Sequence, residues 1–562
     1  MRVLLVLLSL VLAAPVAGVL LSWVRLDAQA LAVLGHQAQT VMAGYVGQSL
    51  LLAAGVAVGT AVLGVGTAVA VALFRFPGRR FFEWGLLLPM AMPAYVLAYA
   101  ATDALQPSGP LQQALSQTLG QTLAAWRGAG PSPGAVGPLV PHVLPDVLPD
   151  VRSLGGAIPL FVLCLYPYVY LLTRTALGDR AVQMMEAARL LGAGLTRRLL
   201  TVALPLARPA VVAGVALALM ETLADYGVGA FFGLATFTTG IYRAWLSMND
   251  PVAASQLASL LLAVVALLLA LERRAQARLR FATSRASAAQ AAEARPVVLR
   301  GAAGWAMGCF CALPVLLGFA LPVAWLMAML WREVQYGEVG LPLERFAQWS
   351  WATFRLAGIS ALAATAVALA LGFALRRPQG PRRGADAALG WAARLLSLGY
   401  AVPGAVVAIG ILVPLGWVQQ RWPESAVTPW FTGTVLGVLY AYLVRFSSVA
   451  LQSVEAGYAR VPGSVDETAR MLGAGRGRVF WRLHLPLLRR PALAAMLLVF
   501  VDVMKELPAT LVLRPFGSDT LAVVAYNLAR DERLAEAALP SLAIVGVGLL
   551  PVILLSRAMR EE

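Results

Sequence analysis

Hydrophobic residues occur in long uninterrupted runs along the whole chain, separated by short segments rich in arginine, proline and glycine. In helical form, about 20 apolar residues cross the ~30 Å hydrocarbon layer of a bilayer. A transmembrane β-barrel would show alternating polar and apolar positions instead. The pattern therefore predicts an all-α polytopic membrane protein with twelve transmembrane helices in two tandem six-helix halves. The expected spans are residues 3–24, 49–73, 83–103, 156–175, 209–231, 254–271, 304–330, 354–375, 390–416, 430–449, 491–512 and 538–556.

Two polar segments 281 residues apart have closely similar sequences, and 281 is half of the chain length of 562. Glu186 to Arg208 and Glu467 to Arg489 align without a gap and are identical at 12 of 23 positions. Repeats of this size in membrane proteins are typical of transporters whose pathway runs between the repeated halves. We therefore expect a first membrane half at residues 1–271, a cytoplasmic linker at 272–303 and a second half at 304–562.

Composition and charge agree with a membrane location. Hydrophobic residues make up 60% of the chain and charged residues only 13%, whereas a soluble protein carries about 25% charged residues. The net charge of +16 comes from arginines in short loops, such as those at 75–80, 273–280 and 376–383. This distribution follows the positive-inside rule, marks those loops as cytoplasmic and argues against nucleic-acid binding. Arg557 and Arg560 favour a cytoplasmic C-terminus, and we expect the N-terminus on the same side.

The segment from Gln106 to Arg152 is rich in proline and glycine and has few basic residues, so we expect it on the external face, with a short surface helix at 111–126. The first apolar run, residues 3–24, has features of a secretory signal, but it is longer than the usual signal core and is expected to be retained. The few cysteines and histidines suggest no disulfide or metal site; they are Cys164, Cys309, Cys311, His36, His142 and His484.

The two similar segments each follow the fourth span of a half and precede the fifth. In both, a glutamate is followed six residues later by a glycine, and a Leu-Pro pair begins twelve residues after that glycine. This spacing predicts a helix–glycine–helix elbow on the cytoplasmic side. An interfacial amphipathic anchor would need no such fixed residues, so the repeat favours docking on two copies of a partner protein.

This pattern resembles the EAA loop of ABC importer permeases. The matching residues of the first loop, 186–208, are Glu186, Ala187, Ala188, Gly192, Leu204 and Pro205, and those of the second loop, 467–489, are Glu467, Thr468, Ala469, Gly473, Leu485 and Pro486. Thr468 replaces the alanine of the family pattern. The resemblance implies the fold of a type I importer permease in a bacterial inner membrane. It also implies two copies of a separate ATPase that bind these loops, and an external substrate-binding protein.

The segment from Lys505 to Leu511, followed by Leu513 to Phe516, resembles fused two-half permeases for ferric iron. The resemblance implies Fe³⁺ as the substrate and no cofactor bound by the chain itself. Importers of thiamine, 2-aminoethylphosphonate or polyamine remain alternatives. A twelve-helix secondary transporter is an alternative of another class, but it does not explain the duplicated loop.

The chain has no means of hydrolysing ATP through a P-loop, because that motif needs a lysine that reaches the phosphates. Its single lysine is Lys505, which stands between Met504 and Glu506. We therefore expect no enzymatic activity in this chain, with ATP used by the partner subunits.

Four acidic residues fall within the predicted fifth spans. The 281-residue offset pairs Glu221 with Asp502 and Asp225 with Glu506, and the i,i+4 spacing places each half's two acids on one face of a continuous helix. Charges at membrane depth cost about 2.5–3.5 kcal/mol each and tend to line pathways or form pairs. Carboxylates suit a hard cation, so we predict a translocation pathway lined by these acids, with Tyr226 and Lys505 beside them. The alternative is that the acids end helices near the outer surface, or that Lys505 neutralises one of them.

Overall fold

The structure is a computed structural model that describes residues 2–21, 23, 28–106, 150–177, 179–282, 297–337, 340–376 and 384–558. Within these residues the fold is helical apart from one pair of two-residue strands. Most of the predicted external segment, including the helix expected at 111–126, lies outside the described residues. The label η denotes a short 3-10 or π segment.

Residues of the first half form these elements: α1 (Arg2–Leu21), α2 (Ala28–Thr40), α3 (Met42–Leu73), β1 (Phe74–Arg75), α4 (Arg79–Gly85), η1 (Leu88–Ala91), α5 (Ala94–Leu105), α8 (Leu154–Leu177), α9 (Asp179–Leu190), α10 (Leu195–Arg198), η2 (Leu199–Ala203), α11 (Leu204–Ala224), α12 (Gly227–Phe231), α13 (Phe237–Tyr242), η3 (Arg243–Ser247) and α14 (Pro251–Ala282).

The second half contains β2 (Val297–Val298), α15 (Ala302–Val315), η5 (Leu316–Ala320), α16 (Leu321–Tyr336), α17 (Leu343–Leu375), α18 (Gly384–Leu396), η6 (Gly399–Ala401), α19 (Gly404–Arg421), α20 (Val427–Gly433), α21 (Leu436–Ala459), α22 (Gly463–Met471), α23 (Arg476–Val479), η7 (Phe480–His484), α24 (Leu485–Leu487), α25 (Arg489–Met504), α26 (Pro508–Leu513), α27 (Leu521–Arg530) and α28 (Leu534–Ala558).

The helices confirm a polytopic all-α membrane protein. Among the described residues, eight helices are long and apolar enough to cross a bilayer, and the number rises to ten if each of two sharply bent helix pairs forms one span. The bends measure 88° between the segment Arg79–Ala91, which contains α4 and η1, and α5, and 78° between α20 and α21. The chain also has shorter apolar helices at Leu5–Leu20 and Leu521–Arg530. The total of twelve spans stays a prediction.

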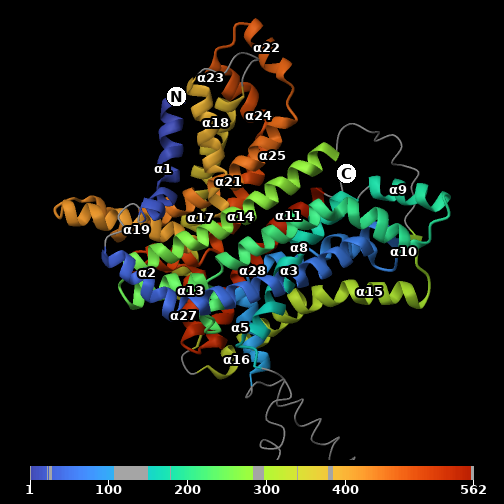
Figure 1. Cartoon of the computed structure of the whole chain (residues 1–562), viewed down its shortest axis with the longest axis horizontal. Helices are drawn as coiled ribbons and strands as arrows, with labels where there is room; N and C mark the ends of the chain where they lie inside the picture. Colours follow the sequence, from blue (N-terminus) through green and yellow to red (C-terminus); the bar gives the residue numbers. More distant parts are fainter. Residues whose placement is uncertain are drawn as a thin grey trace, which may run out of the picture.

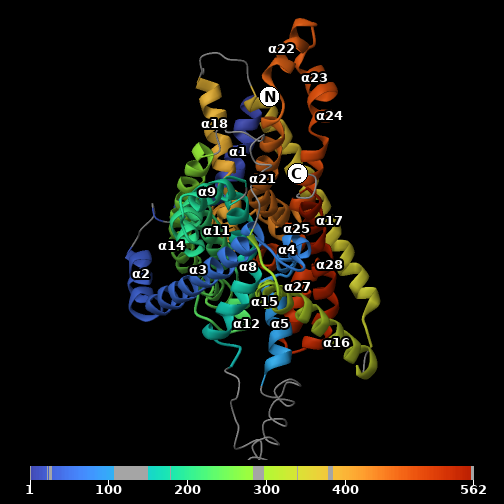
Figure 2. The ribbon, with the colours of Figure 1, turned by 90° about the vertical axis from the view of Figure 1, so that its right-hand side faces the viewer.

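Each half is built around three long helices that pack on one another, α3, α8 and α11 in the first half and α17, α21 and α25 in the second. The first apolar segment of each half also contacts the other half, although α16 packs mainly on α28 of its own half. Helix α1 packs against α18 and α19, and α16 contacts α5 (Figures 1 and 2). Glycine permits the first of these contacts, because a Cβ on Gly18 would lie 2.5 Å from the carbonyl oxygen of Gly410. The two halves are therefore interlocked.

Helix α14 continues to Ala282, so the first residues of the linker predicted at 272–303 are helical. After it, β2 pairs in parallel with β1, and the backbone N–H of Leu299 donates to the carbonyl of Arg75. This contact fastens the start of the second half to the end of α3.

The two predicted fifth spans, 209–231 and 491–512, are wrong as continuous helices. Helix α11 ends at Ala224 and α12 begins at Gly227, while α25 ends at Met504 and α26 begins at Pro508. Proline lacks the backbone N–H that would continue a helix, which explains the second break. Hydropathy misses such breaks because both sides of each are apolar. The acids of each half therefore do not share one face of one helix.

Candidate functional site

A cavity lies between the two halves, where these broken helices meet. Its walls come from the η1–α5 bend, the middle of α8 and α21, and both breaks after α11 and α25. The middle of α8 and of α21 thus lines a cavity between the two halves, and the interface between repeats is the usual place for a transporter site. Its volume is about 120 Å³, room for several water molecules or a small hydrated ion.

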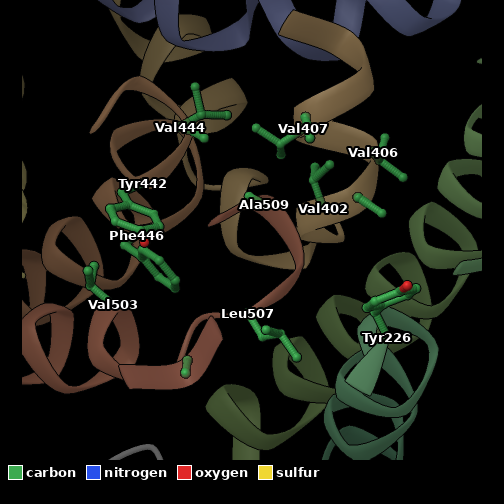
Figure 3. Packing of buried hydrophobic residues seen from close by; sticks show 14 of the residues in the cluster. Tyr226, Val402, Val406, Val407, Tyr442, Val444, Phe446, Val503, Leu507 and Ala509 are labelled. Atoms are coloured by element: carbon green, nitrogen blue, oxygen red, sulfur yellow. The ribbon is translucent and has the colours of Figure 1, made fainter. Parts of the chain in front are cut away.

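All four acids predicted for the pathway line this cavity: Glu221, Asp225, Asp502 and Glu506. Lys505 lines it as well. Tyr226 lies beside it, in an aromatic cluster where its ring stacks on Tyr242 at 3.8 Å between centroids and its hydroxyl accepts a hydrogen bond from Tyr526 at 3.3 Å. Figure 3 shows Tyr226 on the opposite side of Leu507 from Tyr442 and Phe446. The sequence repeat thus locates residues that the fold brings together from both halves.

Two of the acids cap the short helices that follow the breaks. The backbone N–H of Val228 donates to Asp225 Oδ1 at 2.8 Å. Glu506 accepts from the backbone N–H groups of Ala509, at 3.0 Å, and Thr510, at 3.1 Å. The first N–H groups of a helix have no partner within it, so carboxylates at these positions stabilise α12 and α26. Part of the alternative interpretation is therefore correct, since these acids do end helices, although they do so at the cavity.

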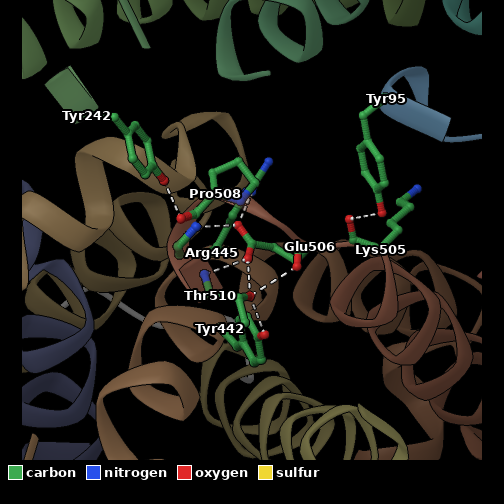
Figure 4. Close-up of polar contacts among 9 residues, drawn as sticks. Tyr95, Tyr242, Tyr442, Arg445, Lys505, Glu506, Pro508 and Thr510 are labelled. Carbon is green, nitrogen blue, oxygen red and sulfur yellow. Dashed lines mark hydrogen bonds and ion pairs between the residues drawn. The ribbon is translucent and has the colours of Figure 1, made fainter. Parts of the chain in front are cut away.

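The second half brings two cations to its acids. Arg445, on α21, has Nη1 at 3.1 Å from Glu506 Oε1, and both side chains are buried (Figure 4). Lys505 Nζ lies 2.9 Å from Asp502 Oδ1. Arg445 is absent from the residues predicted for the site, although an arginine within the apolar run 430–449 is a signal, because charges at membrane depth are rare and functional.

The first half lacks both cations. At the 281-residue offset, Arg445 corresponds to Cys164 and Lys505 to Ala224, and both of these residues also line the cavity. Among the residues that the structure describes, neither Glu221 nor Asp225 is within 4 Å of a basic side chain. Nor does any described group of three His, Cys, Asp or Glu residues lie close enough to hold one metal ion. The charge of the described cavity walls is therefore uneven: the second half contributes two ion-paired acids, and the first half contributes two acids with no basic side chain within 4 Å.

The two predicted elbows project from different parts of the molecule (Figures 1 and 2). In both, the helix ends at a glycine with left-handed backbone angles, φ +82° at Gly192 and +76° at Gly473. The N–H of Ala193 donates to the carbonyl of Ala188, and Ala474 to Ala469, which is the bonding of a glycine-ended helix terminus. Each elbow then widens into a π segment, η2 or η7, just before its Leu-Pro pair, because the proline ring pushes away the carbonyl four residues earlier.

The elbow tips carry apolar side chains exposed to solvent at equivalent positions. Leu190 and Leu191 are 84% and 88% exposed, and Met471 and Leu472 are 89% and 81% exposed. Neighbouring large apolar side chains exposed on a projecting turn are typical of a protein interface. The sequence pattern had drawn attention to the glutamates, glycines and Leu-Pro pairs, but not to these four residues.

Comparison with known proteins decides the family. Residues 60–280 and 387–560 match the family described as the binding-protein-dependent transport system inner membrane component, once in each half. The chain belongs to this family. It is therefore a multi-pass inner-membrane permease of a binding-protein-dependent transport system, and the prediction of two fused permease halves is confirmed.

Two relatives illustrate the range of substrates named for similar permeases. The Fe(3+)-transport system permease protein FbpB 2 of Haemophilus influenzae is 23% identical over 526 residues, which cover 92% of this permease and 90% of the relative. The provisionally named 2-aminoethylphosphonate transport system permease protein PhnV of Salmonella typhimurium is 29% identical over 173 residues, which cover 30% of this permease and 61% of the relative. Only the first similarity extends over both halves.

Proposed function

We propose that this permease imports ferric iron and that two ATPase subunits, bound to its two elbows, drive the transport. An external substrate-binding protein delivers the cargo. The observation that carries the proposal is the similarity to a ferric-iron permease over almost the whole of both chains. The permease itself holds no cofactor, since ATP is used by the ATPase subunits and Fe³⁺ is the cargo.

The charge of the central cavity favours a cation. With every group ionised, four carboxylates and two basic side chains leave a formal charge of −2 on its walls. Carboxylate oxygens are suitable ligands for a hard cation and repel a phosphonate. This supports iron over 2-aminoethylphosphonate, whose named relative matches only part of the chain.

Transport by the purified complex tests the substrate. The permease, its ATPase and its binding protein are reconstituted in liposomes, and ATP-dependent uptake of radiolabelled ferric iron is compared with uptake of 2-aminoethylphosphonate and thiamine. We expect only the iron-loaded binding protein to stimulate ATP hydrolysis and uptake. Stimulation by another cargo, with none by iron, would leave the permease assignment intact and refute iron.

Replacing Gly192 and Gly473 with valine tests the role of the elbows. A non-glycine residue in left-handed conformation costs about 1–2 kcal/mol, and no atom lies near either glycine to cause a clash, so the substitution acts through backbone strain. We expect normal membrane insertion, weaker ATPase binding and at least severalfold slower transport. The matched control is valine at Gly194 and Gly475, whose φ values of −63° and −68° are ordinary. Equal behaviour of the two double variants would argue against the role of these glycines.

The proposed orientation places the elbows and both termini in the cytoplasm and the segment 106–152 outside. A Ser132→Cys variant checks this, in a chain whose exposed Cys309 is replaced by serine. We expect a membrane-impermeant maleimide added to intact cells to label residue 132. Labelling only after the cytoplasmic face is opened would contradict the proposed orientation of the permease.

A further inference from the structure

A buried polar network joins the second elbow to the membrane helices. His484, in η7, has Nε2 at 2.5 Å from Asp466 Oδ1 and Nδ1 at 3.2 Å from the hydroxyl of Tyr458. The other oxygen of Asp466 accepts from Arg376 Nε, also at 2.5 Å. Only 1% of the His484 side chain and 11% of the Asp466 side chain is exposed. Both arms of the elbow, α22 and η7, thus meet at one carboxylate.

Arg376 connects this carboxylate to two membrane helices. It follows the last residue of α17, and its guanidinium donates to the backbone carbonyls of Tyr458, at 3.1 Å, Val461, at 2.8 Å, and Pro462, at 2.7 Å. The same group lies 5.4 Å above the ring of Tyr458, near the end of α21. A planar guanidinium with several bonds fixes orientation as well as distance. The end of α17, the end of α21 and the elbow are therefore held as one unit.

The charge of Asp466 persists at neutral pH. Burial acts to raise its pKa, but the hydrogen bonds from Arg376 and His484 outweigh that effect, and the pKa of Asp466 lies below its ordinary value of 3.8. The network is consequently ionic across the physiological range, and Asp466 remains an acceptor for both partners.

Among the residues that the structure describes, the same joint in the first half has no such network. The 281-residue offset relates Asp466 to Met185, His484 to Ala203 and Tyr458 to Leu177, and the residue that follows α3, where Arg376 follows α17, is Phe74. These four residues are all buried in one apolar cluster. Apolar contact is non-directional, whereas charge-assisted hydrogen bonds impose geometry. The two elbows are therefore attached to similar helices by different chemistry.

We propose that Arg376, Asp466 and His484 are positioning residues that fix the second elbow to α17 and α21, so that this elbow transmits ATPase movement to the cavity more rigidly than the first. The inference rests on the proposed docking of ATPase subunits to the elbows. Helix α21 links the two sites, because it carries Tyr458 near one end and Arg445, the partner of Glu506, about 20 Å away along its axis. Movement of the elbow thereby displaces a cavity charge.

A distance measurement tests the attachment without any cargo. Spin labels are placed away from the elbow tips, at exposed Trp481 and Trp391 to report on the second elbow, and at exposed Leu200, the equivalent of Trp481, and Val298 to report on the first. All variants lack the exposed Cys309. In the full complex, Asp466→Asn or His484→Gln should broaden the distance distribution of the second pair only. Unchanged distributions would overturn the proposal, as would equal broadening at both elbows.

Coupling is measured with the same complexes as iron transported per ATP hydrolysed. We expect Asp466→Asn to lower this ratio about tenfold, an effect within the range of typical coupling energies, while the ATPase remains bound. Met185→Leu, at the equivalent position of the first elbow, should leave the ratio unchanged. If Asp466→Asn does not reach the membrane, Arg376→Lys replaces it. Lysine keeps the positive charge but lacks the planar guanidinium, and both the distance distribution and the transport ratio are measured in this variant. A wild-type ratio in folded variants would refute the positioning role, whereas absence of iron transport in the wild type would refute only the cargo.

Discussion

Replacing Glu221 with glutamine and Asp225 with asparagine in the same chain should abolish iron uptake. Neither acid has a basic side chain within 4 Å in the described structure, so we expect these two carboxylates to interact more strongly with a passing cation than the ion-paired acids of the second half do. An interaction with a charged group is worth about 1.5–3 kcal/mol, and losing two of them lowers uptake by about 100-fold or more. Asparagine keeps the oxygen that caps α12, so the fold should survive. Uptake of radiolabelled iron by reconstituted complexes measures the effect.

The equivalent pair in the second half supplies the comparison. Asp502→Asn removes a charge that Lys505 already balances, and we expect a smaller loss of uptake than Glu221→Gln alone causes at the equivalent position of the first half. Assembly with the ATPase should be normal in both. Wild-type uptake in the Glu221/Asp225 variant would refute the acidic pathway, and equal losses in the two halves would refute the functional difference between them.

Replacing Arg445 with alanine should destabilise the membrane part more than any other single substitution at the cavity. Its removal leaves the buried carboxylate of Glu506 without its cation, and breaking a buried ion pair in this way costs about 3–5 kcal/mol. Glu506 also caps α26, so we expect loosening of the break after α25. Thermal unfolding in detergent, followed by tryptophan fluorescence, measures the change.

A double variant distinguishes the effect of losing the ion-pair partner of Glu506 from the effect of losing the side-chain volume of Arg445. Arg445→Met with Glu506→Gln removes both charges and keeps the volume and the helix cap, so it should recover most of the stability lost in Arg445→Ala. Comparable stability of wild type and Arg445→Ala would show that the pair contributes little to the fold.

Much of the architecture could be predicted because membrane burial is visible in hydropathy and duplication is visible as a constant offset. The offset located the elbows, and it paired Glu221 with Asp502, two residues that the fold brings to one cavity. Gly192 and Gly473 marked helix ends because only glycine adopts a left-handed turn without strain. These features depend on local chemistry or on repetition, and a single sequence contains both.

The helix breaks and the charge pairs could not be predicted in the same way. An apolar run interrupted at Asp225 or Lys505 has the same mean hydropathy as a continuous helix, and only the tertiary fold decides where the chain turns. The pairing of Arg445 with Glu506 joins residues 61 positions apart, and nothing local indicates which buried acid an arginine will meet. The contact of α1 with the second half likewise depends on packing between helices that are far apart in the sequence.

Covalent fusion has a consequence for how this cavity evolved. If one half were encoded alone and assembled as a homodimer, every change at a cavity position would appear twice, so an arginine at position 445 would also replace Cys164. Joining the copies frees each from that constraint and fixes their stoichiometry at one to one. The second half places Arg445 and Lys505 at the cavity, and the first half has Cys164 and Ala224 at the equivalent positions. Such a difference can arise only when the two halves are separate sequences, in a heteromeric or a tandem ancestor.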